Sequence, residues 1–218
     1  MTKIRVGLNG FGRIGRCVTR ILAEEENVEL VAINHCGAIE YMCYKLKYDS
    51  THGTFKGTAS PAEDGNLILN GKKVTVFSTR YVSHCRTLLT RFRDVKELDW
   101  ASVGVDYVID STGIFNNLDK CQPHIDNGAK KVIITAPSPD APMFVYGVNH
   151  EQYSPDMKII SNASCTTNCL APVVKILHDK FGIQEALMTT IHSYTASQML
   201  VDGSSKGKKV KSCDYDIG

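Results

Sequence analysis

The chain has 218 residues, of which 43% are hydrophobic and 22% are charged, and its formal net charge is +2. These values are ordinary for a soluble globular protein, and a charge so close to zero does not support nucleic acid or an anionic membrane as the main partner. No apolar run has the length of a signal peptide core or a membrane span, so we expect a cytoplasmic protein without a membrane partner.

The first part of the chain predicts a strand, a tight turn and a helix. Residues 3–8 form a short strand-like run, and residues 13–25 carry apolar side chains at helical spacing. A β-branched run at 28–33 completes a unit of parallel strand, crossover helix and parallel strand. Because such units build doubly wound sheets, we predict an α/β fold with a Rossmann-type doubly wound parallel sheet.

The turn between these elements is Gly10-Phe11-Gly12-Arg13-Ile14-Gly15, which fits the pattern G-x-G-x-x-G. In this context the pattern predicts a pyrophosphate site at the amino terminus of the helix.

His35 stands where the second strand should end in an acidic residue that binds the ribose hydroxyls. A neutral imidazole cannot replace a charged acceptor, whose hydrogen bonds are worth roughly 1.5 to 3 kcal/mol, so we expect NAD binding to be weakened. Protonated His35 would instead favour the 2′-phosphate of NADP, which is the less favoured alternative. A solvent-facing histidine without a role is the remaining reading.

Residues 54–77 follow a different pattern, with short strands broken by polar turns. Asn70-Gly71 is a strong signal for a two-residue hairpin, so we predict an antiparallel insertion here. Residues 80–92 are basic and fit neither pattern, and we expect them to form an extra surface loop.

The α/β pattern returns with apolar runs at 107–109 and 131–134, which are separated by a helical stretch at 118–125. Both runs read as buried parallel strands and are followed by small or hydroxylated residues. Because open α/β sheets bind ligands at the carboxyl ends of their strands, these residues are expected to lie at the same site as the glycine-rich turn.

Cys165 lies at the start of a predicted helix. Backbone amides and the dipole at the amino terminus of a helix lower the pKa of a thiol, so Cys165 is the candidate nucleophile. His192 follows a strand-like run at 187–191 that we expect to return the imidazole to the same cleft, as a base. The eight cysteines include no C-x-x-C pair, which favours free thiols over a metal or disulfide site.

Several segments together resemble glyceraldehyde-3-phosphate dehydrogenase: 3–16, Tyr48-Asp49-Ser50-Thr51-His52-Gly53, Ser111-Thr112-Gly113, 141–145, 147–150 and 161–172. The likeness covers nearly all of residues 1–205, and Ser-Asn-Ala-Ser-Cys-Thr-Thr-Asn-Cys-Leu-Ala-Pro at 161–172 is its most specific part. It implies an NAD-dependent, phosphorylating aldehyde dehydrogenase of glycolysis. Such an enzyme oxidises glyceraldehyde 3-phosphate with inorganic phosphate to 1,3-bisphosphoglycerate and acts as a homo-oligomer.

The resemblance also implies roles for single residues. Cys165 would attack the aldehyde, and His192 would be the general base. Contacts with the cofactor are implied for Asn9, Gly10, Gly12, Arg13, Ile14, His35 and Thr135. An arginine after residue 77 would also contact the cofactor, and its spacing favours Arg80 over Arg93. Contacts with the substrate or phosphate are implied for Ser164, Thr166 and Thr195.

The family pattern implies an NAD(P)-binding Rossmann domain at 1–160 and an incomplete α+β catalytic domain at 161–218. Beyond Ser205 the likeness is expected to stop, which would leave out part of the substrate site and impair activity. The main alternative is a non-catalytic relative that binds nucleotide or associates with full-length relatives. A cysteine hydrolase that uses Cys165 and His192 ranks last, because it leaves the glycine-rich turn without a purpose.

Overall fold

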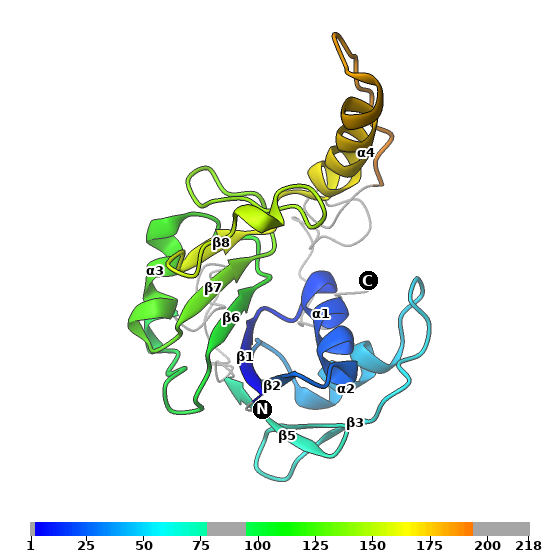
Figure 1. Ribbon diagram of the computed structural model, residues 1–218. Helices are drawn as coiled ribbons and strands as arrows, with labels where there is room; N and C mark the ends of the chain where they lie inside the picture. The colour runs from blue at the N-terminus through cyan, green and yellow to red at the C-terminus, as the bar shows by residue number, and fades with distance from the viewer. Residues whose placement is uncertain (1–2, 78–94, 194–218) are drawn as a thin grey trace, which may run out of the picture.

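The computed structural model describes residues 3–77 and 95–193 (Figure 1). The strands in these ranges are β1 (Ile4–Asn9), β2 (Val28–Asn34), β3 (Ala59–Pro61), β4 (Leu67–Leu69), β5 (Lys72–Phe77), β6 (Tyr107–Asp110), β7 (Lys131–Ile134) and β8 (Ile159–Ser161). The helices are α1 (Arg13–Glu24), α2 (Ile39–Lys47), α3 (Leu118–Asp126) and α4 (Cys165–Phe181), with short 3₁₀ turns η1 (Val95–Glu97) and η2 (His150–Gln152).

One sheet contains these strands in the order β3-β4-β5-β2-β1-β6-β7-β8. All pairs from β5 to β8 are parallel, and this part of the sheet has the strand order of the Rossmann fold. The predicted doubly wound sheet is therefore confirmed. The order reverses between β1 and β6, and ligands bind outside the carboxyl ends of the strands at such a point.

The predicted antiparallel insertion is formed by β3, β4 and β5. Asn70 and Gly71 join β4 to β5 with φ angles of 50° and 78°. Two successive positive φ angles are typical of the tight turns that the twist of a hairpin requires. The same β5 also pairs in parallel with β2, so the insertion extends the main sheet.

The core consists of two apolar clusters. One includes Trp100 and Val132, and the other includes Leu8, Met42 and Leu46. Helix α2, which sequence periodicity did not predict, buries Met42 and Leu46 in the second cluster. In Figure 1, α1 and α2 lie beside the β1–β2 half of the sheet and α3 lies beside β7.

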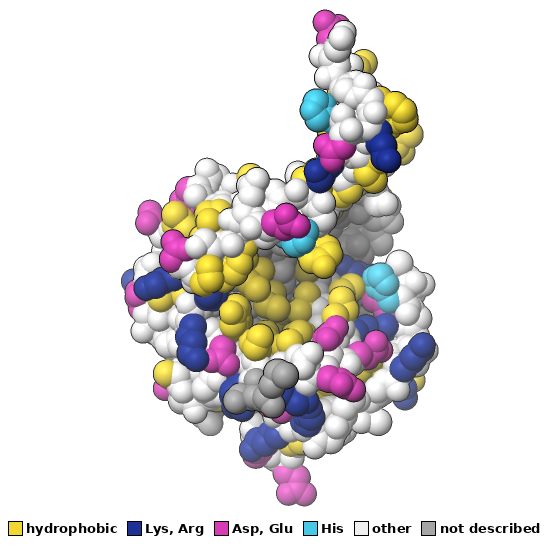
Figure 2. Space-filling model, in the orientation of Figure 1, with side chains coloured by type: hydrophobic (Ala, Val, Ile, Leu, Met, Phe, Trp, Pro, Cys, Tyr) yellow, Lys and Arg dark blue, Asp and Glu magenta, His cyan; other side chains and the backbone are white. Residues whose placement is uncertain are grey.

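Helix α4 has no buried residue and projects away from the sheet (Figures 1 and 2). Its exposed apolar side chains are Val173, Val174, Ile176, Leu177 and Phe181. The strand predicted at 187–191 is wrong, because these residues have no regular secondary structure. No strand in the described ranges pairs with them, and an extended segment without a partner cannot form ladder hydrogen bonds.

Candidate active site

The glycine-rich turn joins β1 to α1 at the carboxyl edge of the sheet. Gly10 has a φ of 97°, which favours glycine, and its amide donates to Asn34 O at 3.0 Å. Gly12 caps α1 without a side chain that could accept from the amides of the first turn, and a Cβ at Gly12 would meet no atom within 4 Å. Open space beside the amides of a helix amino terminus fits the pyrophosphate of a dinucleotide.

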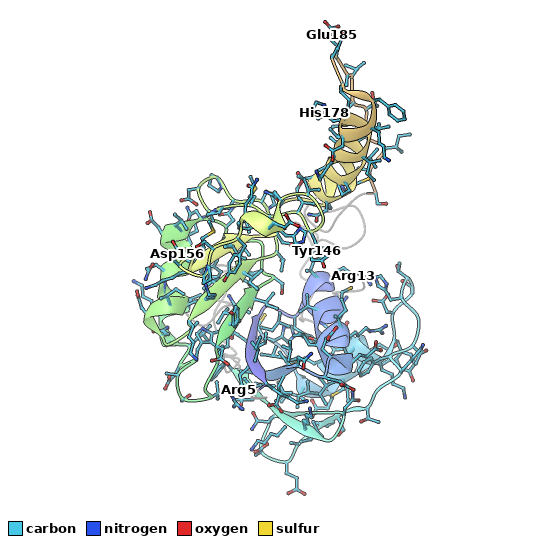
Figure 3. The ribbon with its side chains drawn as sticks, viewed as in Figure 1. Arg5, Arg13, Tyr146, Asp156, His178 and Glu185 are labelled. Carbon is cyan, nitrogen blue, oxygen red and sulfur yellow. The ribbon has the colours of Figure 1, made fainter. Side chains whose placement is uncertain are left out.

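Arg13 and Ile14 begin α1 on the exposed side of this turn. The guanidinium of Arg13 forms an ion pair with the carboxylate of Asp49 (Arg13 in Figure 3). Ile14 exposes 49% of its surface. Burial acts to raise the pKa of Asp49, but the amides of His52 and Thr51 and the charge of Arg13 outweigh it and lower the pKa. Asp49 therefore holds Arg13 at the turn. The segment at 48–53 that contains Asp49 is part of the family resemblance, but no local pattern in it indicates this pairing.

His35 lies directly after β2, and its amide donates to Phe77 O at 3.1 Å. Its ring centroid is 5.6 Å from that of Phe11 in the glycine-rich turn. Burial, followed by the charges of Lys45 and Arg16, lowers the pKa of His35 from 6.5 to about 3. His35 is therefore neutral at physiological pH, which removes the charge on which the NADP alternative depended.

Asn9, the last residue of β1, and Thr135, the first residue after β7, both lie at the carboxyl edge of the sheet. The side chain of Asn9 is buried, and both of its polar atoms are hydrogen-bonded. Its Oδ1 accepts from Asn34 Nδ2 at 2.7 Å, and its Nδ2 donates to Asp110 Oδ2 at 2.6 Å. The amide of Thr135 donates to Asp110 O at 3.0 Å, which places Thr135 directly after β7. The ends of β1, β6 and β7 thus lie together, but the side chain of Asn9 braces the turn and does not reach the surface.

Cys165 is the first residue of α4, shortly after the carboxyl end of β8. Ala163, with a φ of 58°, turns the chain from β8 into the helix, a conformation that is costly for a residue other than glycine. Ser164 caps α4, since its Oγ accepts from the amide of Thr167 at 3.0 Å. Asn168 also holds the turn, because its Nδ2 donates to Asn162 O at 2.7 Å. These contacts fix an exposed cysteine at a helix amino terminus.

His192 completes a pair with this cysteine: Cys165 Sγ and His192 Nε2 are 3.0 Å apart. The hydrogen bond with His192 is the main cause that lowers the pKa of Cys165, and the amide and hydroxyl of Thr166 act in the same direction. The contact between His192 Nδ1 and Ser193 O, at 2.6 Å, is the main cause that raises the pKa of His192, and the hydrogen bond with Cys165 adds to it. The site therefore favours a thiolate and an imidazolium, which is the form in which a cysteine attacks a carbonyl carbon.

Two predicted site residues, Arg80 and Thr195, and the predicted loop at 80–92 lie outside the described residues. Within 3–77 and 95–193, no group of three or more His, Cys, Asp or Glu side chains is placed to hold a metal ion. In the same ranges no helix is both long and apolar enough to cross a membrane.

Two family models match the chain. The NAD binding domain of glyceraldehyde 3-phosphate dehydrogenase matches residues 4–118, and the C-terminal domain of the same enzyme matches residues 164–217. The second match continues past Ser205, where the likeness was expected to stop.

Curated relatives with high identity come from distant organisms. The chain is 56% identical to glyceraldehyde-3-phosphate dehydrogenase of the yeast Ogataea parapolymorpha, over 92% of the chain and 56% of the relative. It is 53% identical to a chloroplastic form from Arabidopsis thaliana, over 93% of the chain and 45% of the relative. It is 52% identical to a cytosolic form from Gracilaria gracilis, over 94% of the chain and 58% of the relative. The chain thus spans about half the length of these relatives.

Proposed function

Because the chain belongs to the glyceraldehyde-3-phosphate dehydrogenase family of oxidoreductases and carries its NAD-binding domain, we propose that it oxidises glyceraldehyde 3-phosphate with NAD and inorganic phosphate to 1,3-bisphosphoglycerate. The proposal assigns 1–160 to the nucleotide domain and 161–218 to the catalytic segment, and the last parallel strand, β8 at Ile159–Ser161, lies at this boundary. A cytoplasmic location is part of the same proposal, with the cytosolic relative as its support.

The 3.0 Å contact between Cys165 Sγ and His192 Nε2 carries this proposal. The thiolate of Cys165 attacks the carbonyl carbon of the aldehyde, and the imidazolium of His192 gives its proton to the carbonyl oxygen, which completes a thiohemiacetal. His192, now neutral, takes the proton of this hydroxyl back as the carbon is oxidised to a thioester. Attack of phosphate on the thioester carbon breaks the carbon–sulfur bond and returns the thiolate of Cys165. NAD, when bound, supplies the hydride acceptor.

The residues around the pair have assigned places in this scheme. Gly10, Gly12, Arg13 and Ile14 would hold the cofactor at the turn, with His35 and Thr135 at the ends of the neighbouring strands. Arg80 would add a further cofactor contact. Substrate or phosphate would be bound by Ser164, Thr166 and Thr195.

Turnover by these 218 residues is expected to be low. Helix α4 buries none of its side chains, so little packing holds Cys165 and His192 in one arrangement. The exposed apolar side chains of α4, from Val173 to Phe181, support association into homo-oligomers or with longer relatives. Apolar surface of this kind is normally covered by another part of a protein or by a partner. Sedimentation of the purified chain tests assembly: a monomer at all concentrations would contradict it.

The activity is tested by following NADH formation with glyceraldehyde 3-phosphate, NAD and phosphate. Cys165→Ala should abolish the reaction, whereas Cys169→Ala, which removes an exposed thiol one turn along the same helix, should retain it. Equal rates in wild type and Cys165→Ala would overturn the catalytic role. Absence of NADH formation in the wild type, together with saturable NAD binding, would instead support a non-catalytic, nucleotide-binding relative.

A further inference from the structure

A set of buried polar side chains runs from the end of β1 to α3, outside the residues that the proposed reaction uses. Asn9, Asp110 and His124 expose 1%, 1% and 0% of their surface. Asp110 Oδ2 accepts from Asn9 Nδ2 at 2.6 Å, and His124 Nε2 lies 3.3 Å from the same oxygen. Polar groups buried this deeply are costly unless they are hydrogen-bonded, so the arrangement of these three side chains is tightly constrained.

Trp100 determines which ring nitrogen of His124 carries the proton. An indole nitrogen can only donate, and Trp100 Nε1 donates to His124 Nδ1 at 3.0 Å. His124 Nδ1 is therefore an acceptor, and the proton of the neutral ring lies on Nε2, where it faces Asp110 Oδ2. The indole ring of Trp100 also packs closely against the backbone of Gly7. A Cβ at Gly7 would lie only 2.7 Å from this ring, so there is no room for a side chain there. His124 thus acts as a one-way donor to Asp110.

The two carboxylate oxygens of Asp110 bind the two turns that form the walls of the proposed nucleotide site, the Asn9-Gly10 turn after β1 and the Thr112 turn after β6. Oδ2 accepts from the side-chain amide of Asn9, while Oδ1 accepts from the amide and hydroxyl of Thr112 at 3.0 and 2.7 Å. The walls also touch each other, since a Cβ at Gly10 would lie 3.0 Å from the Thr112 methyl group. β1 and β6 are the neighbours at which the strand order reverses. A shift of Asp110 would therefore move both sides of the ligand edge.

We propose that Asp110 and His124 are positioning residues for the nucleotide site: His124 holds the Asp110 carboxylate in the orientation that aligns the Asn9-Gly10 turn with the Thr112 turn. Neither residue touches the cofactor. This inference rests on the NAD-binding domain and is independent of the Cys165 and His192 chemistry.

The test compares isosteric variants of His124 in the full chain, with NAD dissociation constants measured by calorimetry and thermal midpoints measured in parallel. In His124→Gln the side-chain amide keeps a donor toward Asp110 but loses the acceptor for Trp100. In His124→Asn the acceptor for Trp100 is kept and the donor toward Asp110 is lost. We expect His124→Asn to weaken NAD binding about tenfold, whereas His124→Gln stays close to wild type.

Trp100→Phe is the matched control at the other end of the network. It removes the indole N–H, but the Asp110 carboxylate still favours the proton of His124 on Nε2, so the variant should lower the thermal midpoint while leaving the NAD dissociation constant close to wild type. Equal weakening in His124→Asn, His124→Gln and Trp100→Phe would indicate a general effect of the core and overturn the proposal.

Two further measurements keep the inference testable if the buried variants do not fold. Thr112→Val removes a donor to Asp110 Oδ1 at a half-buried position, and it should weaken NAD binding several-fold. Unchanged binding would contradict the proposal. Nitrogen-15 spectra of the wild type should show neutral His124 protonated at Nε2, and protonation at Nδ1 would overturn the proposal without any reference to cofactor or turnover.

Discussion

The Cα of Gly15 packs against the carbonyl oxygen of Gly10, with no space between them for a Cβ. This contact sets how closely α1 approaches the end of β1. Gly12, between them, is different, because a Cβ there would point into open space. The glycines of one motif therefore have separate roles, one in packing and one in leaving room for a ligand.

Alanine substitution separates these roles. Gly15→Ala should lower the free energy of unfolding by about 1–3 kcal/mol, because the overlap involves backbone that cannot turn aside. Gly12→Ala should leave stability nearly unchanged but weaken NAD binding, since its methyl group would occupy the space beside the α1 amides. Urea unfolding and NAD titration of both variants provide the measurement. Wild-type NAD affinity in Gly12→Ala would place the pyrophosphate elsewhere.

A carboxylate at position 35 should strengthen NAD binding. His35 is neutral and stands where we expect a charged ribose acceptor, so His35→Asp should lower the NAD dissociation constant about tenfold to a hundredfold. Burial at this position acts against a carboxylate, whereas the charges of Lys45 and Arg16, which disfavour protonation of His35, would favour it. His35→Asn is the neutral control. Equal affinity in the two variants would show that the end of β2 does not contact the ribose.

The buried imidazole of His35 should make stability depend on pH. Its pKa is 6.5 when unperturbed and about 3 in the folded chain, so between these values the unfolded state binds more protons. The free energy of unfolding should therefore fall as pH decreases through this range, by about 1 kcal/mol per pH unit from this group. Urea unfolding at pH 7 and pH 5 should show a smaller loss in His35→Asn. An identical loss in both proteins would contradict the assigned pKa.

Local sequence patterns predicted the elements that local interactions determine. The first strand, the glycine-rich turn and α1 were predicted close to their observed bounds, as was the hairpin at Asn70 and Gly71. Helix α2 was missed because its buried apolar residues, including Met42 and Leu46, alternate with tyrosines and lysines, one of which, Lys45, is itself buried, so the apolar period is hidden. The strand at 187–191 was predicted from composition alone, and a strand also requires a partner.

The contacts that shape the site join residues that lie far apart in the sequence. Cys165 and His192 were selected as candidates from their neighbours, but only coordinates give the 3.0 Å distance between them. Asp49 and Asp110 were not assigned roles, since their partners Arg13 and Asn9 lie 36 and 101 residues away in the sequence. No local period encodes such pairs, so sequence patterns could select candidate reactive residues but not the residues that hold them in place.

The central claim is that Cys165 and His192 form a thiolate–imidazolium pair. Its most direct test is the pH dependence of Cys165 alkylation. Iodoacetamide should modify Cys165 well below the usual thiol range, because the pKa of Cys165 is lowered and that of His192 is raised. His192→Asn should shift this profile to higher pH, while Cys169→Ala should leave it unchanged. The same profile in wild type and His192→Asn, with half-maximal rate at an ordinary thiol pKa, would contradict the account.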